Sequence, residues 1–184
     1  MNAILVVVVL VVLAIIIMYN SLIFKKNQVQ NAQGAIDAYL KQRYNLIPNL
    51  VESVKAYAKH EKETLENIAK YRSLAMDAKD FDEKVGYENM LSSLLNRLMI
   101  NIENYPELKA NVNFLELQNS LKDIENKISA ARRAYNQAVT DYNNAIEMFP
   151  TNIIAKFMNL GRKKVFEIPE DEKKNVNVGE IFNK

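Results

Sequence analysis

The chain has 184 residues and a formal net charge of +2, from 24 Lys and Arg against 22 Asp and Glu. This balance provides no basic face, so we expect no nucleic acid as a partner. Only four glycines and four prolines occur, which favours long helices, and the lack of cysteine excludes thiolate metal sites and disulfides.

The start of the chain is almost entirely apolar. Residues 3–18 form an unbroken apolar run, which continues to Phe24 with only two polar interruptions. As a helix, residues 3–24 would span about 33 Å, enough for the hydrocarbon core of a bilayer plus an interface. A cleaved signal peptide would need a charged start and a small-x-small cleavage site, and a lipoprotein would need a cysteine. We therefore expect an uncleaved single-pass anchor over residues 1–24, in contact with the lipid bilayer through residues 3–24.

The charges around the apolar run predict its orientation. No Lys or Arg precedes it, whereas Lys25, Lys26, Lys41 and Arg43 follow it. Positively charged flanks usually remain on the cytoplasmic side of a membrane. We expect a protein of the cell membrane with a short N-terminus outside and its body in the cytoplasm.

The first helix of the body is expected to continue from the anchor and to end near Pro48. Proline lacks an N–H and disfavours helical backbone in the residue before it, but it fits the first turn of a new helix. We interpret residues 44–48 as a turn between two antiparallel helices, with Asn45 as a cap of the second, over residues 48–77. One kinked helix through Pro48 is the alternative.

Two more helices complete the expected body. A helix over about residues 82–103 follows a break at which Asp80 or Asp82 is the cap, and Pro106 then turns the chain. The last helix is expected to begin after Asn113, as its N-cap. It carries apolar or aromatic residues in alternating steps of three and four, a heptad pattern typical of a coiled-coil seam: Phe114, Leu117, Leu121, Ile124, Ile128, Ala131, Tyr135, Ala138, Tyr142, Ala145 and Phe149.

These elements predict an all-α protein. The expected fold is an N-terminal single transmembrane helix, then an antiparallel up-and-down four-helix bundle and an irregular C-terminal tail. The domain boundaries that we expect are 1–24 for the anchor, 25–158 for the bundle and 159–184 for the tail. The tail has little helical periodicity and mixed charges.

A polar row runs beside the seam of the last helix. It includes Arg132, Asn136 and Asn143, and polar side chains of this kind are costly to bury without partners. The row either faces water or makes specific bonds to other segments. We predict a structural polar network of His60, Glu61, Arg132, Asn136 and Asn143, in which Glu61 pairs with Arg132 or with an asparagine of the row.

The pair His60–Glu61 resembles the start of the zinc-protease motif H-E-x-x-H. That motif needs a second histidine one helical turn later, where this chain has Thr64. His60 is the single histidine of the chain, and no calcium-binding loop pattern occurs. We therefore expect no catalytic residue, no metal site and no cofactor, although a site made of carboxylates alone stays open.

Several short motifs resemble those of the LemA family of membrane-anchored helical proteins, which includes the magnetosome protein MamQ. The resemblance extends from the anchor to Phe166. The motifs that carry it are Leu46-Ile47-Pro48-Asn49-Leu50-Val51, Tyr57-Ala58-Lys59-His60-Glu61 with Thr64-Leu65-Glu66, Tyr105-Pro106-Glu107-Leu108-Lys109-Ala110-Asn111, Arg132-Arg133 with Tyr135-Asn136, and Phe149-Pro150.

This resemblance implies an N-terminal transmembrane helix, a small external N-terminus, an up-and-down four-helix bundle and a structural role for His60–Glu61. The turn motif of the family falls on Asn45, Pro48, Asn49 and Pro106. Tyr44 departs from the family pattern, where an acidic residue is common, and so does the stretch at residues 159–161. Family members have no established catalytic activity, and analogy connects them with membrane protein quality control or membrane shaping.

The sequence therefore favours a membrane-anchored, non-enzymatic interaction or scaffold protein with an unknown protein partner. In one version of this reading, Asn136 and Asn143 are exposed and bind that partner. The alternative is a membrane-remodelling protein that acts by self-association at the bilayer. No nucleophile–base set or phosphate-binding loop favours an enzyme, and no pattern nominates a small-molecule pocket.

Overall fold

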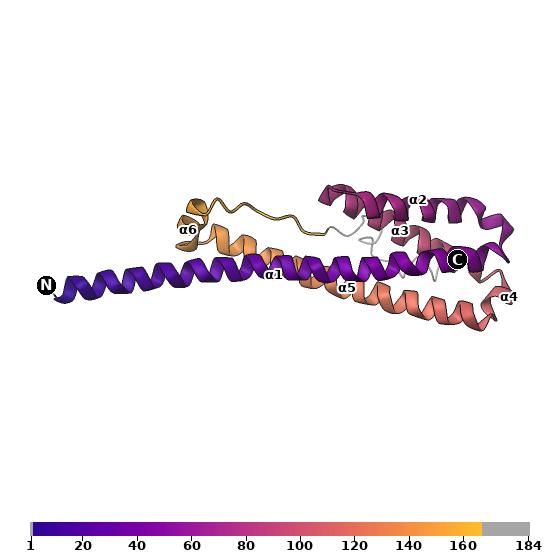
Figure 1. The fold of residues 1–184 in the computed structure, drawn as a ribbon, viewed down its shortest axis with the longest axis horizontal. Coiled ribbons are helices and arrows are strands. Elements are labelled where there is room, and N and C mark those ends of the chain that lie inside the picture. The colour runs from indigo at the N-terminus through magenta and orange to yellow at the C-terminus, as the bar shows by residue number, and fades with distance from the viewer. Residues whose placement is uncertain (1, 167–184) are drawn as a thin grey trace, which may run out of the picture. The chain divides into compact units, whose positions relative to one another are not determined.

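A computed structural model describes residues 2–166 of the chain, and helices form most of this part (Figure 1). No strand occurs within residues 2–166, so the predicted all-α fold is confirmed. The elements in chain order are α1 (Asn2–Lys55), the short 3₁₀ helix η1 (Lys59–Glu61), α2 (Lys62–Asp77), α3 (Phe81–Ile102), α4 (Pro106–Lys109), α5 (Val112–Glu147) and α6 (Thr151–Phe157).

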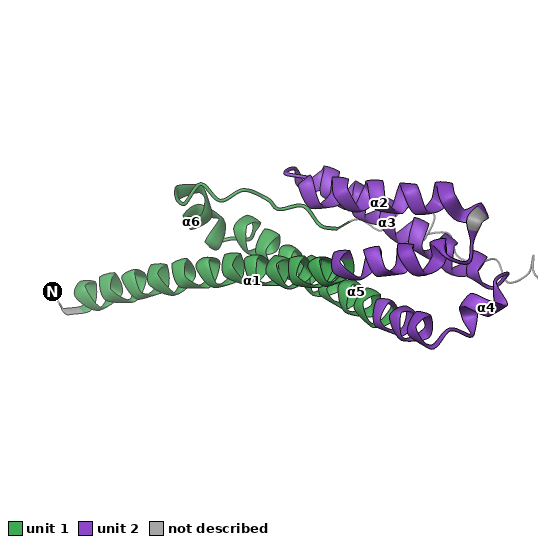
Figure 2. Ribbon diagram, turned by 45° about the vertical axis from the view of Figure 1, so that its right-hand side comes forward, with its two compact units in different colours: residues 1–43, 122–166 green, residues 44–121, 167–184 purple. Residues whose placement is uncertain are grey.

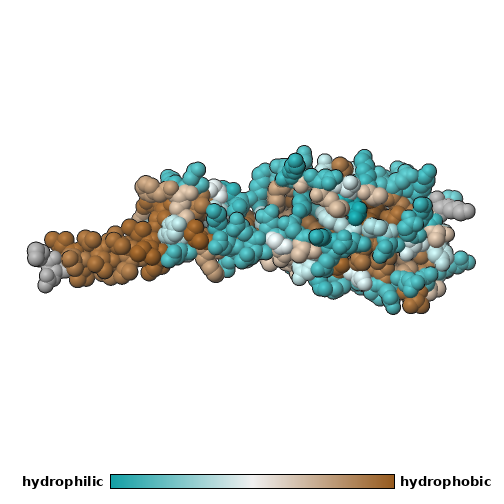
Figure 3. Space-filling model, in the orientation of Figure 1, coloured by the Kyte–Doolittle hydropathy of each residue, from teal (hydrophilic) through white to brown (hydrophobic). Residues whose placement is uncertain are grey.

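The first helix carries the predicted membrane span. All side chains from Ala3 to Ile17 are exposed in the structure, and this is the one stretch within the described residues that is long and apolar enough to cross a membrane. Figure 3 shows the span as an apolar surface. Burial on α1 begins at Leu22 and then recurs at heptad spacing. One helix therefore joins an exposed apolar segment, the candidate membrane span, to a segment that is buried in the protein.

The predicted turn at residues 44–48 is wrong, because α1 continues through Pro48 to Lys55. The single-helix alternative is correct, and Asn45 lies inside the helix instead of capping one. Pro48 has no N–H to donate to the Tyr44 carbonyl one turn earlier. Arg72 of α2 supplies the missing donor, since its Nε lies 2.7 Å from the Tyr44 carbonyl oxygen. This bond compensates for the proline within the helix.

The chain turns after Lys55 instead. The N–H groups of Tyr57 and Ala58 both donate to the Val54 carbonyl, at 3.0 and 2.8 Å, and Ala58 leaves helical geometry with φ −117° and ψ 76°. The predicted helix over residues 48–77 is therefore divided at residues 56–61. No glycine or proline marks this point. Ala58 and Leu65 are both buried, and this burial outweighs the local helix propensity.

The described residues form two compact units (Figure 2). Unit 1 contains the chain up to Arg43 and Lys122–Phe166, and unit 2 contains Tyr44–Leu121. Helices α1 and α5 each contribute to both units.

In unit 1, α1 and α5 pack in opposite directions. The Arg43 guanidinium, which is fully buried, lies 2.6 Å from the Glu125 carboxylate and fixes their register. The predicted α5 seam is confirmed in part: most of its large residues from Phe114 to Tyr142 are buried, Leu117, Ala138 and Ala145 are half-buried, and Phe149 is 80% exposed because α5 ends at Glu147. The buried residues that α1 and α5 contribute to this unit include Leu22, Val29, Ile36, Leu40, Ile124, Ile128, Tyr135, Val139, Tyr142 and Ile146.

In unit 2, α2 and α3 lie side by side and bury one apolar face each. Asp80 caps α3, as predicted, because its carboxylate accepts from the N–H groups of Asp82 and Glu83 at 2.9 and 3.2 Å. The Glu88 side chain is fully buried and accepts a hydrogen bond from the Tyr44 hydroxyl. The ends of α1 and α5 also contribute to this unit, and an up-and-down four-helix bundle stays a prediction.

Helix α5 begins at Val112, and its cap is not the predicted Asn113. The Asn111 side chain accepts from the Phe114 N–H at 3.2 Å, while its carbonyl accepts from the Leu115 N–H at 3.0 Å. Pro106 occupies the first turn of α4, where its missing N–H has no cost.

Replacing Arg72 by Met should lower the free energy of unfolding by about 1–3 kcal/mol, because the Tyr44 carbonyl loses its donor. In a Pro48→Ala background the same replacement should cost less, since the new N–H at position 48 can donate to that carbonyl. Urea unfolding of the full chain in detergent would give both differences. Arg97, which is exposed on α3, is the matched position for a control Arg→Met change. An equal cost in both backgrounds would contradict the role of the bond.

Candidate interaction surfaces

The His60–Glu61 pair lies at the turn from α1 to α2. His60 is exposed, and a Glu61 carboxylate oxygen accepts from the Asn101 side-chain amide at 3.0 Å. This bond joins the start of α2 to the end of α3. Asn101 is therefore the partner of Glu61, and not Arg132 or an asparagine of the α5 row as the sequence led us to expect. Among the described residues, no three His, Cys, Asp or Glu side chains lie together as metal ligands would.

The residues of the family's turn motif lie on the surface of α1 or at the start of a helix. Asn45, Pro48 and Asn49 are exposed. The Asn49 carbonyl accepts from the Ser53 hydroxyl at 2.8 Å. Pro106 begins α4. These residues shape the backbone locally.

The α5 polar row is covered by the chain's own residues 161–166. The Asn143 amide bonds both backbone groups of Lys163, donating to its carbonyl and accepting from its N–H at 2.9 Å each. Asn136 does the same with Phe166, at 2.9 and 2.8 Å. Each asparagine side chain therefore replaces the peptide group of a neighbouring strand. The idea that exposed asparagines of this row bind another protein is wrong, since Asn143 is 7% exposed and both amides are occupied.

The spacing of these bonds follows from helix and strand geometry. Seven residues of α5 separate Asn136 from Asn143 and advance about 10.5 Å, while three extended residues from Lys163 to Phe166 advance about 10 Å. One heptad of helix thus matches three residues of extended chain. The segment runs antiparallel to α5, because the earlier asparagine meets the later backbone residue.

Two tyrosine hydroxyls of α5 bond to the same segment with the same spacing as the asparagines. The Tyr142 hydroxyl donates to the Gly161 carbonyl at 3.2 Å, and the Tyr135 hydroxyl donates to the Lys164 carbonyl at 3.1 Å. Burial raises the pKa of both phenols above the ordinary value. Both groups therefore remain protonated, and able to donate, at neutral pH.

An aromatic residue holds the end of the segment. The Phe166 ring meets the Tyr135 ring edge to face at a centroid distance of 5.2 Å, and the Arg132 guanidinium lies 5.4 Å from the Phe166 centroid. Edge-to-face aromatic pairs and cations over rings are both favourable. The predicted tail is thus irregular but packed over residues 160–166, while its predicted part at 167–184 lies outside the described residues.

The turn that returns the chain to α5 is a Schellman motif at the end of α6. The Leu160 N–H donates to the Ala155 carbonyl at 3.0 Å, and the Asn159 N–H donates to the Lys156 carbonyl at 3.1 Å. Asn159 adopts a left-handed conformation with φ 50°, which glycine and asparagine tolerate best. At the family departure over residues 159–161, this chain therefore places asparagine at the left-handed position of the turn.

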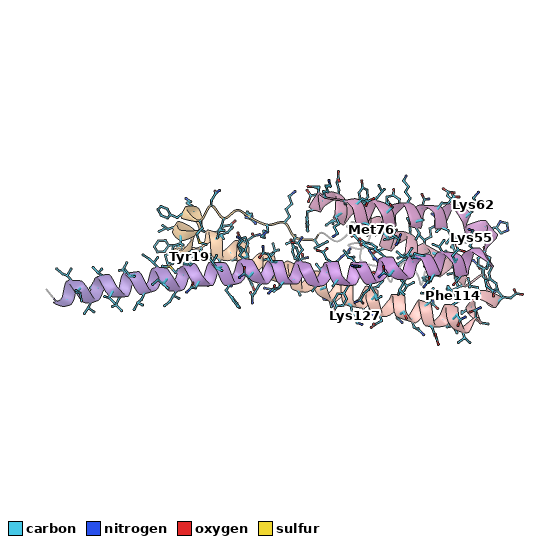
Figure 4. The ribbon with its side chains drawn as sticks, viewed as in Figure 1. Tyr19, Lys55, Lys62, Met76, Phe114 and Lys127 are labelled. Carbon is cyan, nitrogen blue, oxygen red and sulfur yellow. The ribbon has the colours of Figure 1, made fainter. Side chains whose placement is uncertain are left out.

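An apolar groove lies in unit 2. It has a volume of about 420 Å³ and lies between the last turns of α1 and the first turns of α2. Lys55 and Lys62 stand at its rim, and Figure 4 shows both at the same end of the unit. Charges of both signs surround an apolar floor here. The residues that line it are Val51, Lys55, Ala58, Lys62, Leu65, Glu66 and Ala69.

The chain is similar in sequence to known proteins. A family model described as the LemA family matches residues 32–179. Protein LemA of Metamycoplasma hominis is 32% identical over 165 residues, which cover 89% of this chain and 75% of that protein. Magnetosome protein MamQ 2 of Paramagnetospirillum magneticum is 29% identical and MamQ of Magnetospirillum gryphiswaldense is 28% identical. These two matches cover 45% of the chain and only 30% of either relative.

Replacing Asn143 by Ala should release residues 161–166 from α5. The Lys163 N–H and carbonyl would both lose their partner, which should cost about 1–3 kcal/mol of unfolding free energy. Hydrogen exchange of the peptide that contains residues 161–166 should become faster. Asn144→Ala, at the exposed neighbouring position, should change the unfolding free energy by less than about 0.5 kcal/mol. Unchanged exchange in the Asn143 variant would contradict the pairing.

Proposed function

Since the chain belongs to the LemA family, we propose that it works as a single-pass, non-enzymatic membrane protein whose helical body binds another protein. The observation that carries the proposal is the continuity of α1. Its exposed apolar residues suit hydrocarbon, and its later residues are buried at heptad spacing in the body. A helix shared in this way holds the body beside a bilayer.

The orientation belongs to the same proposal. Lys25 and Lys26 follow the span directly, and Lys41 and Arg43 follow further along α1. The positive-inside rule then favours a cytoplasmic body and a short external N-terminus.

The surface that we assign to the protein partner is the apolar groove of unit 2. Ala58 and Leu65 form an apolar floor, while Lys55, Lys62 and Glu66 provide a charged rim. Interfaces between proteins commonly combine a buried apolar anchor with a polar rim. A rim of both signs also fits a protein better than a purely anionic ligand.

A binding role also agrees with the contacts of two carboxylates, Glu61 and Glu88, which could otherwise be candidates for catalysis. Glu61 bonds to Asn101, and Glu88 accepts from the Tyr44 hydroxyl. These contacts join helices to one another. The link to membrane protein quality control, which the family resemblance implied, remains part of the proposal, and the identity of the partner would decide it.

The topology can be tested with single cysteines, because the chain has none of its own. A membrane-impermeant maleimide should label Asn2→Cys in intact cells and should label Lys127→Cys, at an exposed position on α5, after permeabilisation only. The two variants serve as controls for one another. The reverse labelling pattern would place the body outside.

The partner surface can be tested by photocrosslinking in native membranes. A photoreactive amino acid at Lys62 should capture a distinct second protein, and one at Lys127 should not. Ala69→Arg should abolish this product, because it places a charged side chain in the groove.

Ala134→Arg, at an exposed position on α5, should leave the product unchanged and serves as the matched control. A product that survives Ala69→Arg would contradict binding in the groove. Capture of only a second copy of the chain would replace the proposal by self-association, the mechanism of a membrane-remodelling protein.

A further inference from the structure

A second apolar surface in unit 1 lies outside the predicted span. It is formed by α6 and the residues before it, where large apolar side chains are exposed although nearby Ala155 is buried. Four side chains make up this surface, which we call the α6 patch: Met148 at 63% exposure, Phe149 at 80%, Ile153 at 49% and Phe157 at 88%.

The α6 patch lies at the membrane-proximal end of unit 1. The Arg43–Glu125 pair sets the register of the antiparallel helices α1 and α5. Leu22 lies 21 residues before Arg43, and Ile146 lies 21 residues after Glu125, so both stand at the same level because the two helices rise equally per residue. Figure 4 shows α6 beside the labelled Tyr19 of α1. The patch thus begins where the exposed apolar span ends.

Basic side chains accompany the patch. Lys156 on α6 is exposed, as is Arg162 after it, which pairs with Glu147 of α5, while Lys25 and Lys26 follow the span on α1 in the same unit. Ile153 and Phe157 are four residues apart, so they share one face of the helix. Exposed aromatic and aliphatic side chains beside lysine and arginine are typical of a helix at a bilayer interface, where rings enter the headgroup region and cations meet anionic lipids.

We propose that α6 is a second membrane contact, which inserts Phe149, Ile153 and Phe157 into the cytoplasmic interface of the bilayer that α1 crosses. This proposal rests on the anchor and orientation proposed above. Continuity with the span selects lipid as the occupant, because a chain anchored through residues 3–24 holds the patch at the level of the headgroups. The contact would add a second fixed point and so set the tilt of unit 1 on the membrane.

The test uses the full chain in nanodiscs of equal parts phosphatidylcholine and phosphatidylglycerol, with a fluorescent label on one introduced cysteine. Ile153→Cys reports on the patch, Ile16→Cys on the span, and Ala134→Cys on an exposed α5 site about 18 Å of helix further from the membrane than Ile146. Lipids with a nitroxide near the headgroup should quench the label at 153, lipids with a nitroxide deep in the acyl chain should quench the label at 16, and both should leave the label at 134 bright. Phe157→Asp should reduce the quenching at 153.

The outcomes separate the two proposals. Quenching at 16 without quenching at 153 would overturn the α6 contact and leave the anchor intact. No quenching at either site would overturn the anchor itself. A label at 153 that is shielded from water yet unquenched would show a protein cover, such as a second copy, and would also overturn the lipid contact. Equal quenching at 134 and 153 would overturn a contact specific to α6.

Discussion

One hydrogen bond, from the Arg72 guanidinium to the Tyr44 carbonyl, underlies the continuity of α1. Proline in a helix leaves the carbonyl one turn earlier without its usual donor, and a buried carbonyl without a donor is costly. Here a side chain of α2 provides that donor at 2.7 Å. The first helix can therefore extend to Lys55 and contribute both a candidate membrane span and a buried heptad face. The anchoring proposed for this protein rests on that one continuous element.

In a similar way, side chains of α5 serve as hydrogen-bond partners for the backbone of residues 161–166. Asn136 and Asn143 present amide groups at the spacing of one heptad, and an extended chain offers peptide groups at nearly the same repeat. Tyr135 and Tyr142 add hydroxyl donors in the same register. The two asparagines of the polar row thereby find their hydrogen-bond partners within the chain, so neither side-chain amide is open to another protein.

The sequence predicted what depends on periodicity. The apolar run, the α5 seam and the Asp80 cap follow from hydropathy, heptad spacing and residue type, and all three appear in the structure. The sequence-based predictions failed where a side chain bonds to a backbone group or to a residue far along the chain. The Arg72–Tyr44 bond joins residues 28 positions apart. A peptide group that bonds to an asparagine side chain can belong to almost any residue type, so the sequence does not reveal it. Pro48 therefore predicted a turn, and the polar row seemed open to partners.

The asparagine register has an evolutionary consequence. Asn136 and Asn143 contact the peptide groups of residues 161–166, and peptide groups are common to nearly every amino acid. The bonds from Asn136 and Asn143 do not depend on the side chains of this segment, with proline the main exception where an N–H must donate, although Arg162 also pairs with Glu147 of α5 at 2.7 Å. Homologues should therefore vary in this segment at its outward positions and keep the two helix asparagines. The outer face of residues 161–166 can in this way diversify among relatives while its attachment to α5 stays the same.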